Sequence, residues 1–233
     1  MKNVSTELIP EAFKLKNIRL FEKLSEEELE VLEYESTRKS YKKGTVIYRE
    51  GSRHSDFYCI LRGVVKVYKI GTNGKPQIIR FAQRGDVIAY RSLISRELAC
   101  TSAKVMEDTI VCQIPYESIA PLLYSNGQFS QLIMQLLCKE LRESNNLLTD
   151  IAQKSVRGRT AETLLALKEE FGVDELNTLK ISITREDLAN RAGTVTESLI
   201  RVMSEFRNER LLDLPGRKIV FLNTPKLQSV ANY

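Results

Sequence analysis

The pattern of apolar and polar positions changes twice along the chain and divides it into three parts. Between residues 40 and 115, apolar residues gather in short runs rich in β-branched and aromatic side chains, separated by glycines and polar turn residues. After residue 115 the apolar positions recur every three or four residues, which is typical of a helix. From residue 155 onward, short helical patterns alternate with brief strand-like runs. We therefore expect a β-rich part, a long helix and a small mixed part.

The first part predicts an antiparallel β-structure preceded by one short helix. Ser25 and Glu28 have the spacing of a capping box, at the start of a helix that runs from about Phe21 to Glu35. Many short strands with frequent turn signals are typical of a sandwich or barrel. A hairpin tip is expected at residues 71–74. The expected strands are Thr45–Tyr48, Phe57–Leu61, Val64–Ile70, Ile78–Phe81 and Thr109–Ile114.

The second part predicts one long helix over residues 128–151. Apolar residues recur there at the two positions of a heptad that form a coiled-coil interface, and Ser144 is the one polar residue among them. Two copies of this helix can pair along that stripe; the alternative is a helix that packs only on its own domain. The predicted dimer seam consists of Met134, Leu137, Leu141, Leu148 and Ile151.

The third part favours a winged helix-turn-helix. A helix is predicted over residues 159–171, with Gly172 as its C-cap, followed by a strand-like run over residues 180–183. Two helices separated by Gly193 come next. Residues 217–222 resemble the returning strand of a hairpin that turns at residues 215–216. The order of helix, short strand, two helices and hairpin is typical of this DNA-binding module.

The most informative segment is residues 184–202. A helix-turn-helix needs a small residue where its helices touch, a glycine in the turn, and apolar residues that lock the second helix to the first. Thr184 and Thr194 each precede an acidic residue by three positions, so each helix start carries a signal like a capping box. The residues at the required packing and turn positions are Ala189, Gly193, Leu199 and Val202.

The second helix of such a module enters the major groove with its N-terminal end first. The planar fork of Arg201 suits guanine, while Glu197 can accept from the cytosine amino group and orient Arg201. The alternative for Glu197 is a helix cap that also pairs with Arg201 on the surface. The predicted base-reading residues are Thr196, Glu197, Ser198, Ile200 and Arg201. The predicted phosphate contacts are Thr184, Arg185, Arg191, Thr194, Arg217 and Lys218.

Composition and charge are consistent with a DNA-binding protein but do not by themselves indicate one. The 233 residues suit two modest domains, and the net charge of +5 is spread along the whole chain. No apolar stretch approaches the roughly 20 residues that cross a bilayer. Residues 1–13 contain acidic and polar side chains where a secretory signal has an apolar core. We expect a cytoplasmic protein without a membrane partner.

Cysteines and histidine give no sign of a metal site or of catalysis. The four cysteines, Cys59, Cys100, Cys112 and Cys138, lack short regular spacing and are predicted to be buried, inert thiols. His54 is the only histidine and is expected in a turn. Most zinc sites and histidine-based triads are therefore excluded. With no glycine-rich phosphate loop either, an enzyme is disfavoured.

The whole arrangement resembles the Crp/Fnr family of bacterial transcription regulators. Lys43–Gly51 and Phe57–Tyr68 resemble its cyclic-nucleotide-binding β-roll, Val156–Leu165 its first DNA-domain helix, and Glu197–Arg201 its recognition helix. The resemblance implies an α+β fold with an N-terminal antiparallel, jelly-roll-like β-roll, a long dimerisation helix and a C-terminal winged helix-turn-helix. The corresponding parts are residues 1–127, 128–154 and 155–233. It also implies a homodimer, a palindromic operator in double-stranded DNA, and RNA polymerase as a partner.

The effector site departs from the pattern of the members that bind cyclic AMP. Their cassette reads Gly-Glu and later an arginine that pairs with the phosphate, whereas this chain has Gly85-Asp86 and places Thr101 where the arginine belongs. Because a buried phosphate without its cation is costly, cyclic AMP is disfavoured. Arg91 and Arg96 lie in the same cassette and can supply a charge from a different place. The predicted effector-pocket residues are Asp86, Arg91, Ser92, Thr101, Ser102, Ser144 and Asn145.

The resemblance leaves the effector and any cofactor unidentified. Ser144 and Asn145 fall where cyclic-AMP-binding relatives contact the adenine, and they can face a ligand, each other across a dimer, or water. The N-terminal cysteine cluster of the oxygen-sensing branch is missing, which argues against an iron–sulfur sensor. Haem remains open, with His54 as its one histidine candidate. We predict a dimeric, sequence-specific regulator whose β-roll signal re-aims the DNA domains at a hinge near Ser155; the alternative is a small-molecule sensor that acts through protein contacts.

Overall fold

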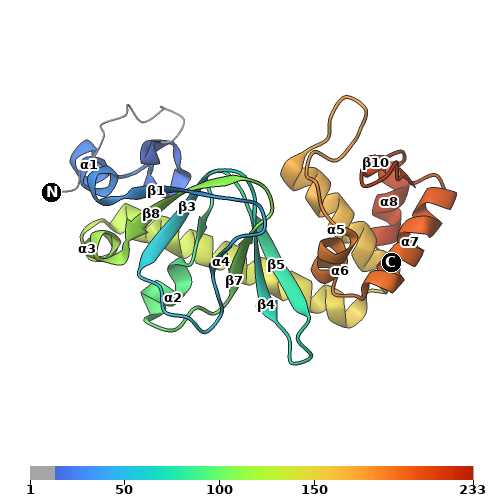
Figure 1. Ribbon diagram of the computed structural model, residues 1–233, viewed down its shortest axis with the longest axis horizontal. Helices are drawn as coiled ribbons and strands as arrows, with labels where there is room; N and C mark the ends of the chain where they lie inside the picture. The colour runs from blue at the N-terminus through green and yellow to red at the C-terminus, as the bar shows by residue number, and fades with distance from the viewer. Residues whose placement is uncertain (1–13, 233) are drawn as a thin grey trace. The chain divides into compact units, whose positions relative to one another are not determined.

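The computed structural model describes residues 14–232, which form two compact units (Figure 1). One unit comprises residues 14–70 and 79–140, and the other comprises residues 71–78 and 141–232. The sequence segment 1–13, for which no secretory signal is expected, lies outside the described residues. None of the helices within residues 14–232 combines the length and apolar character that crossing a bilayer requires.

Two four-stranded antiparallel sheets build the first unit, as the sequence predicts. Their strand orders are β1-β8-β3-β6 and β2-β7-β4-β5, with β3 and β8 paired over most of their length. The five expected strands are present within a few residues of the predicted bounds. The strands are β1 Thr37–Tyr41, β2 Val46–Tyr48, β3 Asp56–Arg62, β4 Val65–Ile70, β5 Pro76–Ala82, β6 Val87–Ile88, β7 Ser102–Val105 and β8 Thr109–Pro115.

The helices of the first unit precede the strands, lie between β6 and β7, and follow β8. The capping box at the start of α1 (Glu26–Glu35) is confirmed: Ser25 Oγ accepts from the Glu28 amide at 3.2 Å, and the Ser25 amide donates to the Glu28 carboxylate at 2.8 Å. Two short 3₁₀ turns precede it, at Leu15–Asn17 and Arg19–Phe21. The other helices are α2 Tyr90–Ser95, α3 Tyr116–Ser125 and α4 Gly127–Gln153.

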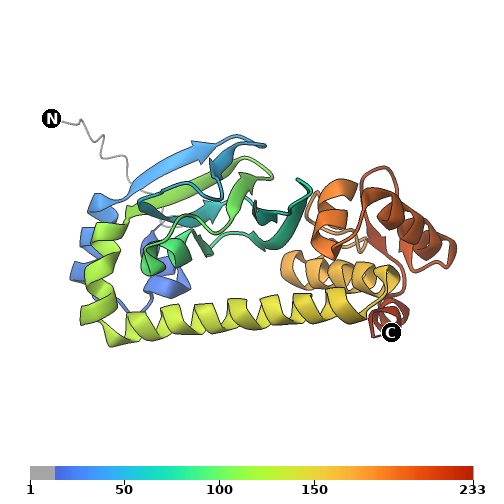
Figure 2. The ribbon, with the colours of Figure 1, turned by 90° about the horizontal axis from the view of Figure 1, so that it is seen from below.

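The long helix α4 is unbroken over its 27 residues (Figure 2). Its N-terminal half presents Phe129 and Ile133 to the core of the first unit, where Phe129 stacks on Phe21. Glu140 lies on the same buried face and is only 8% exposed. A carboxylate thus occupies a position where the spacing of the helix predicts an apolar residue.

The second unit contains a winged helix-turn-helix, as predicted, with its helices and its hairpin in the expected order. Ser155 caps α5 by accepting from the Gly158 amide at 3.1 Å, so this helix begins earlier than expected. The wing turns at residues 215–216, where Gly216 has a φ of 62°. The elements are α5 Val156–Phe171, α6 Arg185–Ala192, α7 Thr196–Asn208, β9 Leu212–Asp213, β10 Val220–Phe221 and α8 Thr224–Ala231.

Two local expectations are wrong. The run at residues 180–183 is not a strand, because the bridges fall earlier, at Val173–Leu179 and Thr178–Val220. The four cysteines are not all buried: Cys59 and Cys112 are, but Cys100 is partly exposed and Cys138 is exposed. Cys138 is two residues before Glu140 on α4, so the turn of the helix directs it away from the buried face.

Candidate nucleic-acid interface and internal cavity

Local hydrogen bonds fix the turn between α6 and α7. Thr184 Oγ1 accepts from the Asp187 amide at 3.0 Å, so the predicted cap of α6 is confirmed. Gly193 ends α6 with a left-handed φ of 63°, which glycine adopts without steric cost. Thr194 does not cap α7, contrary to the prediction, because its amide donates to the Ala189 carbonyl at 3.0 Å and closes the end of α6. The residue that precedes α7 is Val195, without a side-chain cap.

Helix α7 has one buried face and one exposed face. Leu199 and Val202 are buried against the rest of the module, as predicted, together with Met203 and Phe206. On the other face Glu197 and Arg201 are exposed, and the side chain of Ile200 is 48% exposed. Within residues 14–232 the side chains of Glu197 and Arg201 have no hydrogen-bonding or ionic partner, so the alternative side-chain pair between them is not formed here. The base-reading residues Thr196, Glu197, Ser198, Ile200 and Arg201 all fall in the first two turns, and their role stays a prediction.

Arg157 of α5 forms ion pairs and a cation–π contact with the C-terminal end of α7. Its guanidinium lies 3.0 Å from the Glu205 carboxylate, donates to Glu209 at 2.7 and 2.8 Å, and sits 4.8 Å from the centre of the Phe206 ring. These contacts involve the C-terminal half of α7 and leave the outward face of its first two turns, with Glu197, Ile200 and Arg201, exposed. A rigid helix with a free polar N-terminal face is the geometry that groove reading requires.

The predicted phosphate contacts occupy different environments. Thr184, at the start of α6, and Arg217 and Lys218, in the wing turn, are exposed. Thr194 is partly buried. Arg185 and Arg191 are also partly buried, and burial lowers the pKa of both guanidinium groups, although arginine stays charged at neutral pH. All six assignments stay predictions.

A stripe of exposed apolar side chains runs along α4. The exposed fractions of Met134, Leu141 and Leu148 are 57%, 62% and 68%, and that of Ile151 is 39%. Leu137, the fifth residue of the predicted dimer seam, is partly buried against the core of the first unit. Apolar side chains this exposed at heptad spacing usually mark a surface that is covered in an assembly.

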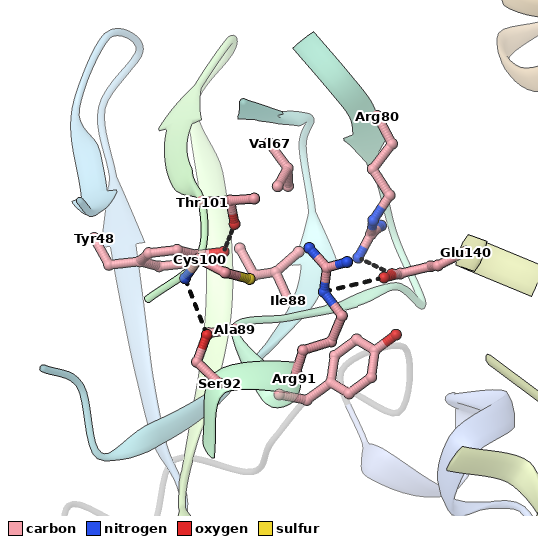
Figure 3. Close-up of a pocket in the computed structure, with 11 residues that line it drawn as sticks. Tyr48, Val67, Arg80, Ile88, Ala89, Arg91, Ser92, Cys100, Thr101 and Glu140 are labelled. Atoms are coloured by element: carbon pink, nitrogen blue, oxygen red, sulfur yellow. Dashed lines mark hydrogen bonds and ion pairs between the residues drawn. The ribbon is translucent and has the colours of Figure 1, made fainter. Parts of the chain in front are cut away.

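A small polar cavity lies inside the first unit (Figure 3). Arg80 from β5 and Arg91 from α2 both approach Glu140 of α4, at 3.0 and 3.4 Å respectively. The cavity volume is about 20 Å³, which is room for one water molecule. It is lined by Tyr48, Val67, Arg80, Ile88, Ala89, Tyr90, Arg91, Ser92, Cys100, Thr101 and Glu140.

Hydroxyl groups and buried charges complete the cavity wall. Tyr48 Oη and Thr101 Oγ1 are 3.5 Å apart, and Ser92 Oγ accepts from the Cys100 amide at 3.1 Å. Burial raises the pKa of Tyr48, and burial together with the Glu140 charge raises that of Tyr90. Burial is the largest single influence on the pKa of Arg80 and lowers it, but the charges of Glu140, Asp86 and two tyrosines together raise this pKa above its ordinary value.

The sequence identifies only part of this cavity. Arg91, Ser92 and Thr101 line it, whereas Asp86 and Ser102 do not. The Asp86 carboxylate accepts from the Gln83 amide at 2.8 Å, and Ser102 Oγ accepts from the Glu50 amide at 2.9 Å. Ser144 is partly exposed and Asn145 exposed, in the part of α4 that belongs to the second unit. Their role as effector contacts stays a prediction.

Sequence reasoning missed Arg80 and Glu140, although each carries a signal. Arg80 shares a strand face with Ile78 and Ala82, which are both fully buried, so alternation along β5 directs it inward. Glu140 follows Phe129 and Ile133 at helical spacing on the buried face of α4. A charge at an inward position of a strand and another at an inward position of a helix are the pattern of a buried ion pair.

His54 lies in the loop between β2 and β3 and contacts aromatic rings. Its ring centre is 5.4 Å from that of Tyr48 and 6.4 Å from that of Tyr58, and burial lowers its pKa. Among residues 14–232, no group of three or more His, Cys, Asp and Glu side chains has the arrangement of a metal site.

Comparisons with known proteins match both units. Residues 38–126 match the family "Cyclic nucleotide-binding domain", and residues 158–230 match "Crp-like helix-turn-helix domain". The chain is 28% identical to the Fumarate and nitrate reduction regulatory protein of Vibrio cholerae, over 89% of this chain and 84% of that protein. It is 27% identical to the Anaerobic regulatory protein of Bacillus subtilis, over 82% of each. The structure of FixK2 from Bradyrhizobium japonicum has a similar fold, with a TM-score of 0.75 and 24% identity over 84% of this chain and 96% of that one.

Proposed function

The chain belongs to the Crp/Fnr family of transcription regulators and is not an enzyme; on this premise we propose that it is a homodimer whose two α7 helices read a palindromic operator. The observation that carries the proposal is the free N-terminal face of α7, where Glu197, Ile200 and Arg201 are exposed. Arg201 offers two parallel N–H groups to guanine O6 and N7, and Glu197 accepts from a cytosine amino group. Thr196 and Ser198 reach neighbouring base edges or phosphates from the first turn.

The exposed stripe on α4 supports the homodimer. Met134, Leu141 and Leu148 are more than half exposed and lie one heptad apart, so a second α4 buries them all by packing in parallel. A two-fold axis along the helices relates the two α7 helices, which matches the symmetry of a palindromic operator with half-sites about 34 Å apart.

Exposed basic residues of the wing and an exposed hydroxyl at the start of α6 support the choice of DNA as the partner. Arg217 and Lys218 project from the wing turn, and Thr184 lies at the exposed N-terminus of α6. Contacts of these kinds with phosphates position a module on the duplex without reading its sequence. We further propose a cytoplasmic protein that works with RNA polymerase, and a signal from the first unit that passes through α4 to the junction at Ser155.

The decisive experiment is duplex selection followed by a binding titration. Purified protein is incubated with sheared genomic DNA, the retained fragments are sequenced, and the recovered operator is compared with a scrambled duplex by fluorescence anisotropy at several salt concentrations. We expect a palindromic motif, affinity for the operator at least about a thousandfold above the scrambled duplex, and a linear fall of log affinity with log salt. Duplex binding that does not depend on salt, or no enriched motif, overturns the proposal and favours a sensor module that acts through protein contacts.

A further inference from the structure

The cavity of the first unit contains the carboxylate of Glu140, a residue of the chain itself. Glu140 is 8% exposed and lies on the face of α4 that packs Phe129 and Ile133 into the core. Burying an ionised carboxylate is costly unless cations and hydrogen bonds compensate it. The position therefore calls for partners, and the structure supplies two.

Two guanidinium groups from different elements converge on Glu140. Arg80 reaches the Glu140 Oε1 atom at 3.0 Å and also donates to the Val87 carbonyl at 2.7 Å, which fixes its orientation. Arg91 Nε lies 3.4 Å from Glu140 Oε2. The side chain of Arg80 is 18% exposed and that of Arg91 is 36% exposed, so the pair with Arg80 is the more deeply buried one. The carboxylate is thus held between a strand and a short helix.

An anionic effector would need the same two arginines. Arg80 and Arg91 are the cationic side chains among the residues that line the cavity. Carboxylate and phosphate oxygens bind the guanidinium fork in the same way, so they compete for it. The remaining volume of about 20 Å³ accommodates a water molecule but not a nucleotide. An anion of that size can enter only if Glu140 leaves.

We propose that Glu140 is an internal ligand of this cavity: its carboxylate takes the place of an anionic effector between Arg80 and Arg91, and the regulator binds its operator without a nucleotide. Leu141, the next residue of α4, begins the exposed stripe of the proposed dimer seam beyond this point. The two ion pairs therefore fix α4 between Met134 and Leu141, within the segment that is proposed to pair with a second copy. The inference rests on the proposed function, because its regulatory output is operator binding.

Removal of the carboxylate and its replacement by a free one test this inference. Glu140→Ala leaves the two arginines unpaired around an enlarged cavity. We expect a lower unfolding midpoint and about tenfold weaker operator binding, a typical size for allosteric coupling. Sodium acetate restores both, because acetate fits the space that the side chain vacates, whereas sodium chloride at equal ionic strength does not. Glu27→Ala, which removes an exposed carboxylate of α1, is the matched control and gives the same midpoint and affinity in the two salts at equal ionic strength.

Glu140→Gln separates charge from shape and serves if the alanine variant does not fold. Glutamine fills the same volume without a charge, so operator binding weakens while acetate finds no room and restores nothing. Wild-type protein is titrated with operator in the absence and presence of cyclic AMP and cyclic GMP. We expect the operator affinities in the three conditions to agree within about twofold, because a ligand that is not bound shifts no equilibrium.

Three results overturn the inference. They are a tenfold gain in wild-type operator affinity on addition of either cyclic nucleotide, full operator affinity in folded Glu140→Ala and Glu140→Gln variants, and equal rescue by chloride and acetate. Failure of the proposed function looks different, since then the wild-type protein itself binds no duplex. In that case the acetate-dependent rise of the unfolding midpoint in Glu140→Ala still tests whether the cavity holds its own carboxylate.

Discussion

Arg159 donates from Nη2 to the carbonyl oxygen of Gly193 at 3.1 Å, which ties α5 to the turn between α6 and α7. The same guanidinium donates to the Ala192 carbonyl at 2.9 Å and to the Lys154 carbonyl at 2.6 Å. These acceptors lie at the ends of α6 and α4, where unpaired carbonyls carry partial negative charge. One cation therefore holds the helix-turn-helix turn against the end of the long helix.

Replacing Arg159 by alanine loosens this joint. Hydrogen bonds from a charged donor are each worth about 1.5–3 kcal/mol, so we expect the variant to lose about 2 kcal/mol of unfolding free energy. Operator affinity falls as well, because α7 loses its fixed position relative to α4. Arg159→Lys restores only part of both, since one ammonium group cannot reach all the acceptors of a planar fork. Urea unfolding and operator anisotropy measure the two effects.

The control for this joint is Lys226→Ala, which removes an exposed cation from α8. We expect it to change neither the urea midpoint nor operator binding. An Arg159→Ala variant with the stability and affinity of the wild type would show that the three carbonyls bind water instead and that this residue does not hold the joint.

Gly193 is expected to tolerate no side chain without cost. Its φ of 63° strains any L-residue, and an added Cβ would lie 3.2 Å from Cγ1 of Ile151. We expect Gly193→Ala to destabilise the protein by about 1–2 kcal/mol. Gly127→Ala is the matched control, because Gly127 lies in a helix without a positive φ and has no neighbour within 4 Å. In thermal unfolding, the midpoint of Gly193→Ala should fall clearly below that of the wild type, and the midpoint of Gly127→Ala should not.

Features that depend on neighbouring residues could be predicted from the sequence. The capping box of Ser25 and Glu28 needs only two residues at fixed spacing, and so does the cap of α6 by Thr184. Thr194 has the same spacing before an acidic residue, yet its amide completes the end of α6. Thr194 thus lies where a C-terminal signal for α6, with Gly193, overlaps an N-terminal signal for α7, and only the first of these forms.

Features that depend on pairing between distant segments could not be predicted. Strand β1, with the sequence Thr-Arg-Lys-Ser-Tyr, is a polar edge strand that resembles a loop and forms only because β8 lies beside it. In the same way, Arg80 and Glu140 each occupy an inward position, but nothing local shows that the two meet. The sequence therefore predicted part of the cavity lining, Arg91, Ser92 and Thr101, and missed the ion pairs with Glu140.

Substitutions of Arg201 and Lys218 are expected to change DNA binding in different ways. Arg201→Ala removes a base contact, so operator affinity falls by about 1–3 kcal/mol while binding to a scrambled duplex changes little. Lys218→Ala removes a charge in the exposed wing turn, so both duplexes lose affinity equally and the salt slope falls by about 1. Paired titrations on operator and scrambled duplexes separate these outcomes. An equal loss on both duplexes for Arg201→Ala would contradict base reading by this residue.

A charge in the middle of the exposed stripe should separate the subunits. Leu141 is 62% exposed, so Leu141→Glu costs the isolated chain little, but a symmetric dimer buries two copies of the new carboxylate opposite each other. Loss of about 1.5 kcal/mol of apolar burial at each copy alone weakens association about a hundredfold. Arg142→Glu changes the charge of the next, exposed residue outside the stripe and should leave the dimer intact. Sedimentation velocity distinguishes the two species, and a Leu141→Glu protein that sediments as a dimer would place the subunit interface elsewhere.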